Sequence, residues 1–374
     1  MGKRKCAVEG MVSPEFFQGK RILITGHTGF KGTWLCRMLA DFGADVTGYA
    51  LLSPTKEGAK VFRSVIGEDI LSIEGDIRDI HRLKQVFMQA KPEIVFHLAA
   101  QPIVVESYSH PLETYEVNVM GTVNLMECVR VSGTVRSVVN VTTDKVYENK
   151  EWVWGYRETD TLNGYDPYSN SKSCSELVTH CYAQSFFTKQ EIAVSTLRAG
   201  NVIGGGDFSP YRILPDCVRA AITGNDIEVR NPEAVRPYQH VLEPLYAYLM
   251  VAQAQWYDSS YSGCYNVGPD ERDAVTTGIL ADMFCELWNE GQQWRANDIN
   301  GPHEANLLRL DCSKLKTTFG WEPRWGIRKA VESAVEWYKV YVKNGDIREK
   351  MSLQIQDFLK CNRRNLKKGR GEDK

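Results

Sequence analysis

A strand-like run that leads into three evenly spaced glycines constrains the fold of this chain more than any other feature. The stretch "RILITGHTGFKGTWL" places Gly26, Gly29 and Gly32 between an apolar run and a helix-like run. Gly26 permits a tight turn, Gly29 lets the backbone approach a pyrophosphate, and Gly32 allows close packing of helix on strand. The N–H groups at the start of the helix would attract phosphates. The predicted dinucleotide-binding loop consists of Gly26, Thr28, Gly29, Phe30, Lys31 and Gly32.

Strand-like and helix-like runs alternate through the first half of the chain. Four apolar runs are typical of strands: 21–26, 45–51, 93–100 and 135–143. Three runs with helical spacing lie between them: 31–43, 81–90 and 114–133. This alternation indicates βαβ units and a parallel sheet covered on both faces. Right-handed crossovers then give an α/β fold, a Rossmann-type doubly wound parallel sheet.

The alternation breaks near residue 200, where "GGGDFSPYRILPD" is rich in Gly and Pro. We therefore expect a dinucleotide-binding domain over 14–200, with some later segments interleaved. A smaller C-terminal substrate-binding lobe is expected mainly over 201–345. The N-terminal 1–13 and the charged tail 362–374 are predicted to be disordered.

Composition excludes several classes of protein. A formal net charge of -2 argues against nucleic acid or a membrane surface as the main partner. No apolar run approaches the roughly 20 residues that a membrane span needs. The 10 cysteines are scattered without metal-ligand spacing, which favours reduced thiols in the cytoplasm and predicts no metal site.

The expected acid at the end of the second strand is absent. That strand normally ends in Asp or Glu, which binds the adenosine ribose, but "DVTGYALLSP" ends without one. The residues alone therefore leave NAD and NADP both open. His27 and Lys31 are candidate phosphate partners. Residues expected further along the cofactor are Asp76, Ile77, Leu98, Ala99, Ala100 and Gln101.

Two pairs of residues are candidates for catalysis. Tyr168 and Lys172 in "YDPYSNSK" are spaced i, i+4, so on a helix they share one face. A cationic Lys172 would lower the pKa of Tyr168 and favour a phenolate that can accept a proton. Asp144 and Lys145 follow the strand-like run 135–143, and by themselves they are either a catalytic pair or a surface ion pair.

The motifs "TGHTGFKG", "HLAAQ", "EVNVMGT", "NVTTD" and "YSNSK" resemble those of the extended short-chain dehydrogenase/reductase superfamily. Within it, four stretches resemble the CDP-glucose 4,6-dehydratase family: "TTDKVYENKEWVWGYRE", "NGYDPYSNSK", "RAGNVIGGGD" and "VRPYQHVLEPL". The resemblance covers about residues 14 to 345. Thr143 stands where these enzymes often have Ser, and Val146 where Cys is common.

This resemblance implies a redox-neutral conversion of CDP-glucose with NAD as cofactor. Tyr168, supported by Lys172, would take the O4 proton as hydride leaves C4, and Thr143 would hydrogen-bond O4. Water would leave across C5 and C6, with protonated Asp144 as acid and neutral Lys145 as base. Lys145 can act so only if its pKa lies below its usual value of about 10.4. The product, a 4-keto-6-deoxy sugar nucleotide, would serve deoxysugar biosynthesis of the O-antigen type.

The resemblance also implies a substrate site and an assembly. The residues expected to bind the nucleotide sugar are Asn201, Arg212, Leu214, Arg236, His240, Asn266 and Glu304. Asn118 is expected to support the backbone and a water relay, and Trp152 and Trp154 to pack in the core. Two largely apolar helices, 114–131 and 168–187, predict a homodimer or homotetramer.

Two other functions remain open. A nucleotide-sugar 4-epimerase would also use Thr143, Tyr168 and Lys172, but it would not need an acid and a base at 144 and 145. A non-catalytic dinucleotide-binding regulator would tolerate loss of Tyr168 or Lys172, and both are present.

Overall fold

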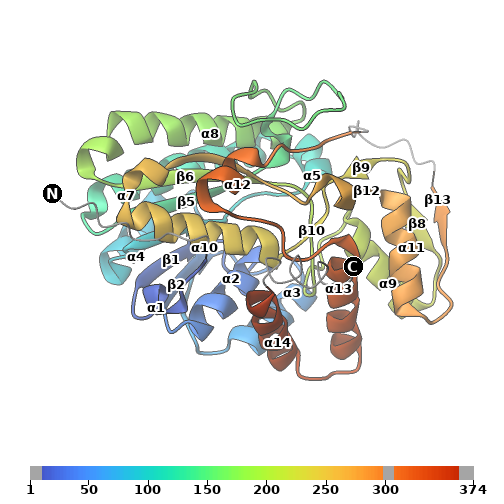
Figure 1. Ribbon diagram of the computed structural model, residues 1–374. Coiled ribbons are helices and arrows are strands. Elements are labelled where there is room, and N and C mark those ends of the chain that lie inside the picture. The colour runs from blue at the N-terminus through green and yellow to red at the C-terminus, as the bar shows by residue number, and fades with distance from the viewer. Residues whose placement is uncertain (1–10, 298–306, 362–374) are drawn as a thin grey trace, which may run out of the picture.

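The computed structural model describes residues 11–297 and 307–361 (Figure 1). A seven-stranded sheet forms its centre, in the order β3-β2-β1-β4-β5-β6-β11, and every neighbouring pair is parallel. The strands are β1 Arg21–Thr25, β2 Asp45–Ala50, β3 Leu71–Glu74, β4 Ile94–His97, β5 Ser137–Thr143, β6 Ala193–Ala199 and β11 Gly263–Val267. This order confirms the doubly wound α/β fold. Its switch point lies between β1 and β4, where such sheets bind ligands at the carboxyl ends of the strands.

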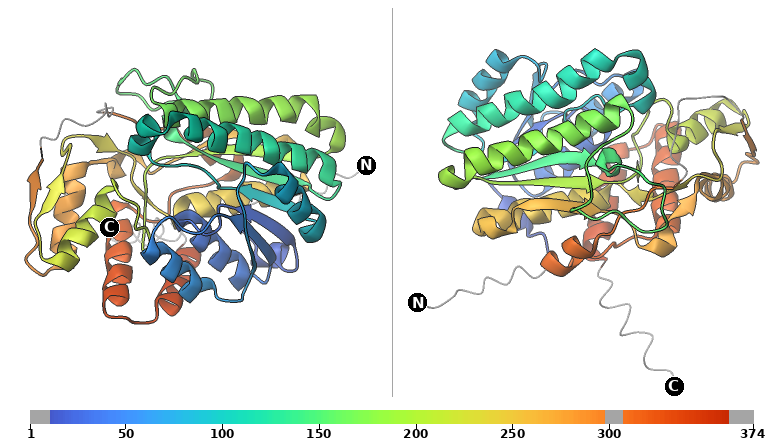
Figure 2. Two further views of the ribbon diagram at one scale, coloured as in Figure 1. Left: turned by 180° about the vertical axis from the view of Figure 1, so that it is seen from behind. Right: turned by 90° about the horizontal axis from the view of Figure 1, so that it is seen from above.

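Helices cover both faces of the sheet (Figures 1 and 2). One face carries α4 Ile80–Ala90, α7 Gly121–Ser132 and α8 Pro167–Ser185 over a core that includes Leu83, Leu125 and Val138. The other face carries α2 Phe30–Asp41, α3 Lys56–Ile66, α10 Leu242–Tyr257 and α14 Ile347–Lys360. Both faces of the strands are therefore buried, which explains their nearly continuous apolar sequences.

The later part of the chain builds a smaller lobe beside the carboxyl ends of the strands (Figure 1). Its helices are α9 Ile213–Thr223, α11 Thr277–Trp288 and α13 Ile327–Val342. Its short strands are β7 Val202–Ile203, β8 Ile227–Val229, β9 Val235–Arg236, β10 Gln239–His240, β12 Val275–Thr276 and β13 Trp294–Ala296. Between these elements the chain returns to the main sheet through α10, β11 and the short helix α12 Ser313–Phe319.

Two segments differ from the sequence-based expectation. The helix predicted over 114–133 is divided into α6 Pro111–Tyr115, a π-helical turn Glu116–Met120 and α7. The wide turn carries Asn118, whose side chain bonds the backbone of Gln101. Residues 11–13, expected to be disordered, pack on α10: the N–H of Val12 donates to Tyr246 Oη at 3.0 Å. They lead into the short helix α1 Pro14–Phe17.

Two further features bear on function. Among the described residues, no helix is long and apolar enough to cross a membrane. The same part of the chain contains no group of three or more His, Cys, Asp or Glu side chains that could hold a metal ion.

Candidate active site

The glycine loop between β1 and α2 is closely packed at two of its three glycines. Gly26 has a φ of +75°, and a Cβ there would lie 2.6 Å from the backbone nitrogen of Ala99. A Cβ on Gly32 would lie 2.3 Å from the carbonyl oxygen of Gly26. Beside Gly29, by contrast, the space is nearly open, and its backbone borders the N-terminus of α2. The loop therefore fits the pyrophosphate of a dinucleotide.

The cofactor segments predicted after β2, β3 and β4 surround this loop. Thr28 Oγ1 donates to the carbonyl oxygen of Leu51 at 2.7 Å, which anchors the exposed segment after β2 where the acid is missing. Asp76 forms an ion pair of 2.6 Å with Arg78, whose guanidinium lowers the pKa of that carboxyl group. Ile77 is buried against Gly121.

The segment Leu98 to Gln101 is held by hydrogen bonds at the carboxyl end of β4. The N–H of Ala99 donates to Thr25 Oγ1 at 3.3 Å. Asn118 accepts from the N–H of Gln101 at 2.9 Å and donates to its carbonyl oxygen at 3.1 Å. Its Nδ2 also donates to Ser171 Oγ on α8 at 2.9 Å, so Asn118 joins this segment to the helix that carries Tyr168.

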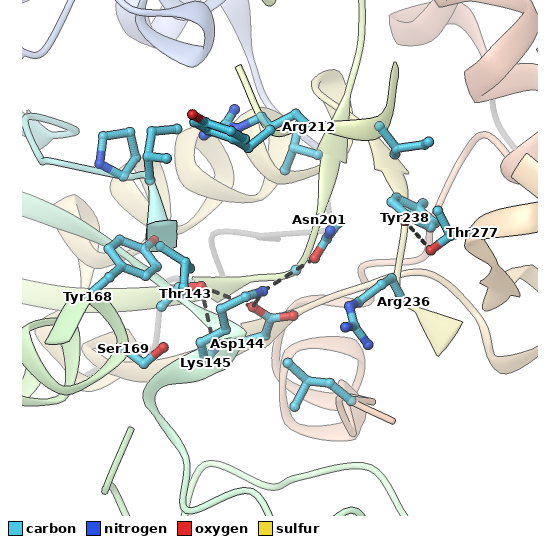
Figure 3. Close-up of a pocket in the computed structure, with 18 of the residues that line it drawn as sticks. Thr143, Asp144, Lys145, Tyr168, Ser169, Asn201, Arg212, Arg236, Tyr238 and Thr277 are labelled. Carbon is cyan, nitrogen blue, oxygen red and sulfur yellow. Dashed lines mark hydrogen bonds and ion pairs between the residues drawn. The ribbon is translucent and has the colours of Figure 1, made fainter. Parts of the chain in front are cut away.

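Thr143, Asp144, Lys145 and Tyr168 line one cavity of about 340 Å³ (Figure 3). β5 extends beyond β4 and pairs Thr143 with Ala199. The turn of Asp144–Val146 therefore begins at the carboxyl end of β5. Thr143 Oγ1 donates to Asp144 Oδ1 at 3.0 Å. The Asp144 side chain is 1% exposed, and Lys145 Nζ lies 3.4 Å from its Oδ1. Asp144 is thus buried and Lys145 is partly exposed, and both side chains line the cavity, which is not the arrangement of a surface ion pair.

Tyr168 and Lys172 lie on the first turns of α8, which Asp166 caps. Burial raises the pKa of Tyr168 to about 12, while a hydrogen bond with Thr143 and the charge of Arg212 act against that rise. The pKa of Tyr168 is therefore raised overall, whereas the sequence-based expectation was a lowering by Lys172. Lys172 Nζ donates to the carbonyl oxygen of Val141 at 3.3 Å, and burial lowers its pKa to about 8.

Lys31, predicted to contact a phosphate, lines the same cavity as Thr143, Asp144, Lys145 and Tyr168. Burial lowers its pKa to about 7, and the positive charges of Arg212 and Lys172 act in the same direction. Arg212 itself forms an ion pair of 2.9 Å with Asp207. Lys31 and Arg212 therefore lie on the same cavity wall, and Asp207 balances the charge of Arg212.

Four of the predicted substrate residues line this cavity: Asn201, Arg212, Leu214 and Arg236. Asn201 Oδ1 accepts from Lys145 Nζ at 3.5 Å, which directs the amine into the cavity (Figure 3). The backbone at Gly200, just before Asn201, approaches Asp144 so closely that a Cβ there would lie 3.3 Å from Oδ2.

Two predicted substrate residues lie elsewhere. His240 is fully buried between the rings of Trp34 and Trp325, and its Nδ1 accepts from the N–H of Leu242. Asn266 donates to the carbonyl oxygens of Tyr156 and Asp311 and accepts from Tyr147. Neither side chain lines the cavity, and the contacts of both stabilise the fold.

Glu304 lies outside the described residues.

His27 and Trp154 correct two further expectations. His27 is buried beneath β2, where its Nε2 bonds Ser72 Oγ at 2.7 Å and a Cβ on Gly48 would meet its ring, so it faces away from any phosphate. Trp154 is 70% exposed and is not a core residue. Trp152 is partly buried and stacks on Tyr156 at 5.3 Å.

Sequence reasoning missed several cavity residues and the buried network behind them. Additional lining residues are Tyr147, Tyr165, Asp207, Tyr211, Glu228, Arg230, Asn231, Tyr238 and Thr277. Behind the cavity Glu176, one turn after Lys172, forms a buried ion pair of 2.9 Å with Arg198 and accepts from Thr196 at 2.6 Å. Arg198 in turn donates to Tyr147 Oη at 2.8 Å. In the sequence, only the position of Glu176 four residues after Lys172, on the same face of the helix, pointed to this network.

Known proteins share both sequence and fold with this chain. The model of the family described as GDP-mannose 4,6 dehydratase matches residues 23–334. The CDP-glucose 4,6-dehydratase of Salmonella typhimurium is 44% identical over 95% of this chain and 100% of that protein.

Two solved structures show the same fold at low identity. The dTDP-glucose 4,6-dehydratase of Bacillus anthracis in complex with NAD has a TM-score of 0.70 and 20% identity, over 87% of this chain and 98% of that one. The UDP-glucose 4-epimerase of Thermotoga maritima with UDP-glucose has a TM-score of 0.73 and 23% identity, over 86% and 99%. The family match and the 44% identical relative together show that this chain belongs to the nucleotide-sugar 4,6-dehydratases, and among them to the CDP-glucose 4,6-dehydratase family.

Proposed function

We propose that the protein is an NAD-dependent CDP-D-glucose 4,6-dehydratase, a hydro-lyase that forms CDP-4-keto-6-deoxy-D-glucose and water. The observation that carries this proposal is the buried Asp144 beside Lys145, in the same cavity as Tyr168 and Thr143. Oxidation at C4 needs only Tyr168 and its neighbours. An acid and a base placed beyond C4 are needed only if water is then eliminated.

NAD is the proposed cofactor, and when bound it supplies a hydride acceptor for C4 and returns the hydride to C6. The open backbone at Gly29 and the close contacts of Gly26 and Gly32 support this assignment. Lys31 at the start of α2 would face the phosphates or the sugar from the cavity wall.

The first step removes a proton from O4 of the sugar. Tyr168 is the proposed acceptor, because its side chain lines the same cavity as Thr143, Asp144 and Lys145. Thr143 would also hydrogen-bond O4 and hold C4 in place. A positive charge near Tyr168 favours the ionised phenol, and Arg212 already acts in that direction.

The second step eliminates water from the oxidised sugar. The 4-keto group acidifies the C5 proton, which Lys145 would take as a neutral amine. Asp144, as a neutral acid, would give its proton to the departing C6 hydroxyl. The two groups lie 3.4 Å apart, close enough to act on neighbouring carbons of one sugar ring. Lys145 would then return its proton to C5 as hydride reaches C6.

The substrate diphosphate would lie along Arg212, Arg236 and Asn201. A planar guanidinium suits a diphosphate because it donates two parallel hydrogen bonds. Leu214 borders the same cavity. The cytidine specificity is inferred from the 44% identical relative, and the product would enter deoxysugar synthesis of the O-antigen type.

Incubation with CDP-glucose and NAD+ tests the proposal. The product should show the alkaline absorbance of a 4-ketosugar, and UDP-glucose and dTDP-glucose should be poorer substrates. A C4 epimer without keto product would instead identify an epimerase. Binding of the dinucleotide without any turnover would identify a regulator.

Two finer assignments belong to this proposal. A cytoplasmic location is supported by nine cysteines that are free thiols in the described residues. A homodimer or homotetramer is supported by apolar side chains exposed on and beside α7 and α8: Met120, Val131, Leu177 and Phe186.

A further inference from the structure

The turn that carries Asp144 and Lys145 lies between two fixed points (Figure 3). The first is the end of β5, where Thr143 pairs with Ala199 on β6. The second is Tyr147, the residue directly after the turn, which is 1% exposed and lines the cavity. The directions in which Asp144 and Lys145 enter the cavity therefore depend on how firmly Tyr147 is held.

The hydroxyl of Tyr147 is bonded to the interior of the protein. Its oxygen accepts from Arg198 Nη1 at 2.8 Å, and the hydroxyl donates to Asn266 Oδ1 at 2.6 Å. Both partners are buried side chains that do not line the cavity. Burial raises the pKa of the Tyr147 phenol, so the hydroxyl keeps the proton that it donates to Asn266. The phenol is therefore placed to hold the end of the turn.

Arg198 is itself held in one orientation by Glu176 on α8. Its Nε and Nη2 donate to the two carboxylate oxygens of Glu176 at 3.0 and 2.9 Å, while Nη1 is directed at Tyr147. The same two oxygens accept from the hydroxyls of Thr142 and Thr196. A planar guanidinium with two parallel bonds to one carboxylate has a fixed direction, which a lysine ammonium does not have. Tyr147 is therefore anchored to a group of defined geometry.

The ion pair of Arg198 and Glu176 is better explained by this geometry than by stability. Both side chains are 3% exposed, and the cost of taking two charges out of water offsets much of their attraction. In other proteins, well-packed apolar side chains often replace such a pair without loss of stability. Apolar side chains, however, could not direct a hydrogen bond at Tyr147.

We propose that Tyr147 and Arg198 are positioning residues, which hold the turn so that Asp144 and Lys145 meet C6 and C5 of the sugar. Neither positioning residue exchanges a proton with the substrate. Their contribution is the place of the turn in the cavity. This inference rests on the proposed dehydratase function.

Oxidation at C4 and the elimination of water depend differently on this turn. Tyr168 reaches the cavity from α8, and Thr143 belongs to β5, so the groups proposed for oxidation lie outside the turn. Asp144 and Lys145, which are proposed for elimination, both lie on it. A looser turn should therefore slow elimination and spare oxidation.

Tyr147→Phe tests the proposal, because phenylalanine keeps the ring and removes only the hydroxyl. The variant should fold, since Arg198 Nη1 still donates to the carbonyl oxygen of Glu158 at 3.2 Å. The turn also keeps a bond to α8, in which Ser173 Oγ donates to the carbonyl oxygen of Val146 at 2.7 Å.

Single turnovers with CDP-glucose and NAD+ separate the two steps. Oxidation is followed as the rise of reduced nicotinamide, and elimination as sugar nucleotide that has lost water, measured by mass spectrometry of quenched samples. In Tyr147→Phe, oxidation should stay within about twofold of the wild type and elimination should be about 10- to 100-fold slower, because a shift of about 1 Å can cost that much.

A merely structural role of the hydroxyl would give a different result. Fewer enzyme molecules would then be active, so the amplitudes of both steps would fall together and the ratio of their rates would not change. An unchanged ratio in Tyr147→Phe would overturn the proposal, while turnover by the wild type would leave the dehydratase function intact. A wild type that forms no keto product would refute the function itself.

Two further variants complete the test. Tyr265→Phe, one residue before Asn266 on β11, removes a hydroxyl that donates to the carbonyl oxygen of Tyr261 at 2.6 Å, and it should leave the ratio of the two rates unchanged. Arg198→Lys keeps the positive charge but loses the planar fork, so it should slow elimination relative to oxidation as Tyr147→Phe does. A folded Arg198→Lys enzyme with the wild-type ratio would overturn the proposal.

Discussion

At the residue scale, the site separates oxidation from elimination. Tyr168 and Lys172 come from α8, whereas Asp144 and Lys145 come from the turn that follows β5. Tyr168, Asp144 and Lys145 line one cavity but reach it from different elements, so single substitutions should stop the reaction at different stages.

Lys145→Met should spare C4 oxidation and block elimination, because the proposed C5 base is lost while Tyr168, Lys172 and Thr143 remain. Enzyme mixed with CDP-glucose should show reduced nicotinamide absorbance that rises and persists. Turnover should fall about 100- to 10,000-fold, the usual range for loss of an acid or base. Substrate recovered from D2O should carry little deuterium at C5.

Asp144→Asn is the contrasting variant. Exchange at C5 should survive, since Lys145 remains, while loss of the C6 hydroxyl slows. If Lys145→Met still exchanges C5 at a near wild-type rate, another group is the base and Lys145 is only the ion-pair partner of Asp144.

The site residues that could be predicted from the sequence are those that belong to short local motifs. The spacing of Tyr168 and Lys172 and of the glycines follows from backbone geometry: both side chains lie on the first turns of α8, and the glycines form the turn between β1 and α2. His240 and Asn266 were misassigned because a polar residue after a strand can equally bond the backbone, as Asn266 does. Tyr147 and Thr277 reach the cavity only through the tertiary fold, so no local pattern could reveal them.

At the element scale, sequence periodicity predicted four strands and three helices of the first half, but it missed α3, β3 and the interruption of the helix over 114–133. The helix predicted over 114–133 contains a π-helical turn because Asn118 is held by Gln101 and Ser171. Such a turn depends on hydrogen-bond partners that are distant in the sequence, so the spacing of hydrophobic residues does not predict it. For the same reason, the role of β11 as an edge strand beside β6 became visible only in the fold.

Leu177→Glu should break the proposed dimer. Leu177 is 57% exposed in the middle of α8, and a buried carboxylate at a two-fold axis would face its own copy. Light scattering at micromolar concentration should give a dimer or tetramer for the wild type and a monomer for the variant. Met88→Glu, at an exposed position on α4, is the control and should leave the assembly unchanged. A wild-type monomer would contradict the proposed assembly.

At the scale of the whole molecule, buried polar groups make stability depend on pH. Burial lowers the pKa of His27 to about 4 and those of His97 and His240 to about 3. Below the ordinary histidine pKa of about 6.5, these histidines are protonated in the unfolded chain but stay neutral in the folded protein. Stability should therefore be full above pH 6.5 and fall as the pH drops toward 4.

Urea unfolding at pH 7 and pH 5 measures this effect. Each of the three histidines should cost about 2 kcal/mol of the free energy of unfolding between these two values. His27→Gln should make the decrease in the free energy of unfolding between pH 7 and pH 5 smaller by about 2 kcal/mol. His81→Gln, at an exposed position, should not change that decrease. Equal stability of the wild type at the two pH values would show that these histidines are not held neutral.

In the proposed reaction, one hydride leaves C4 and returns to C6 of the same sugar, while Asp144 and Lys145 remove water between these steps. CDP-glucose labelled with deuterium at C4 tests it most directly. The account predicts a 4-keto-6-deoxy product with one deuterium at C6, detected by mass spectrometry and NMR, and no loss of label to water. Label that remains at C4 of a C4 epimer, or that never appears at C6, would contradict the account.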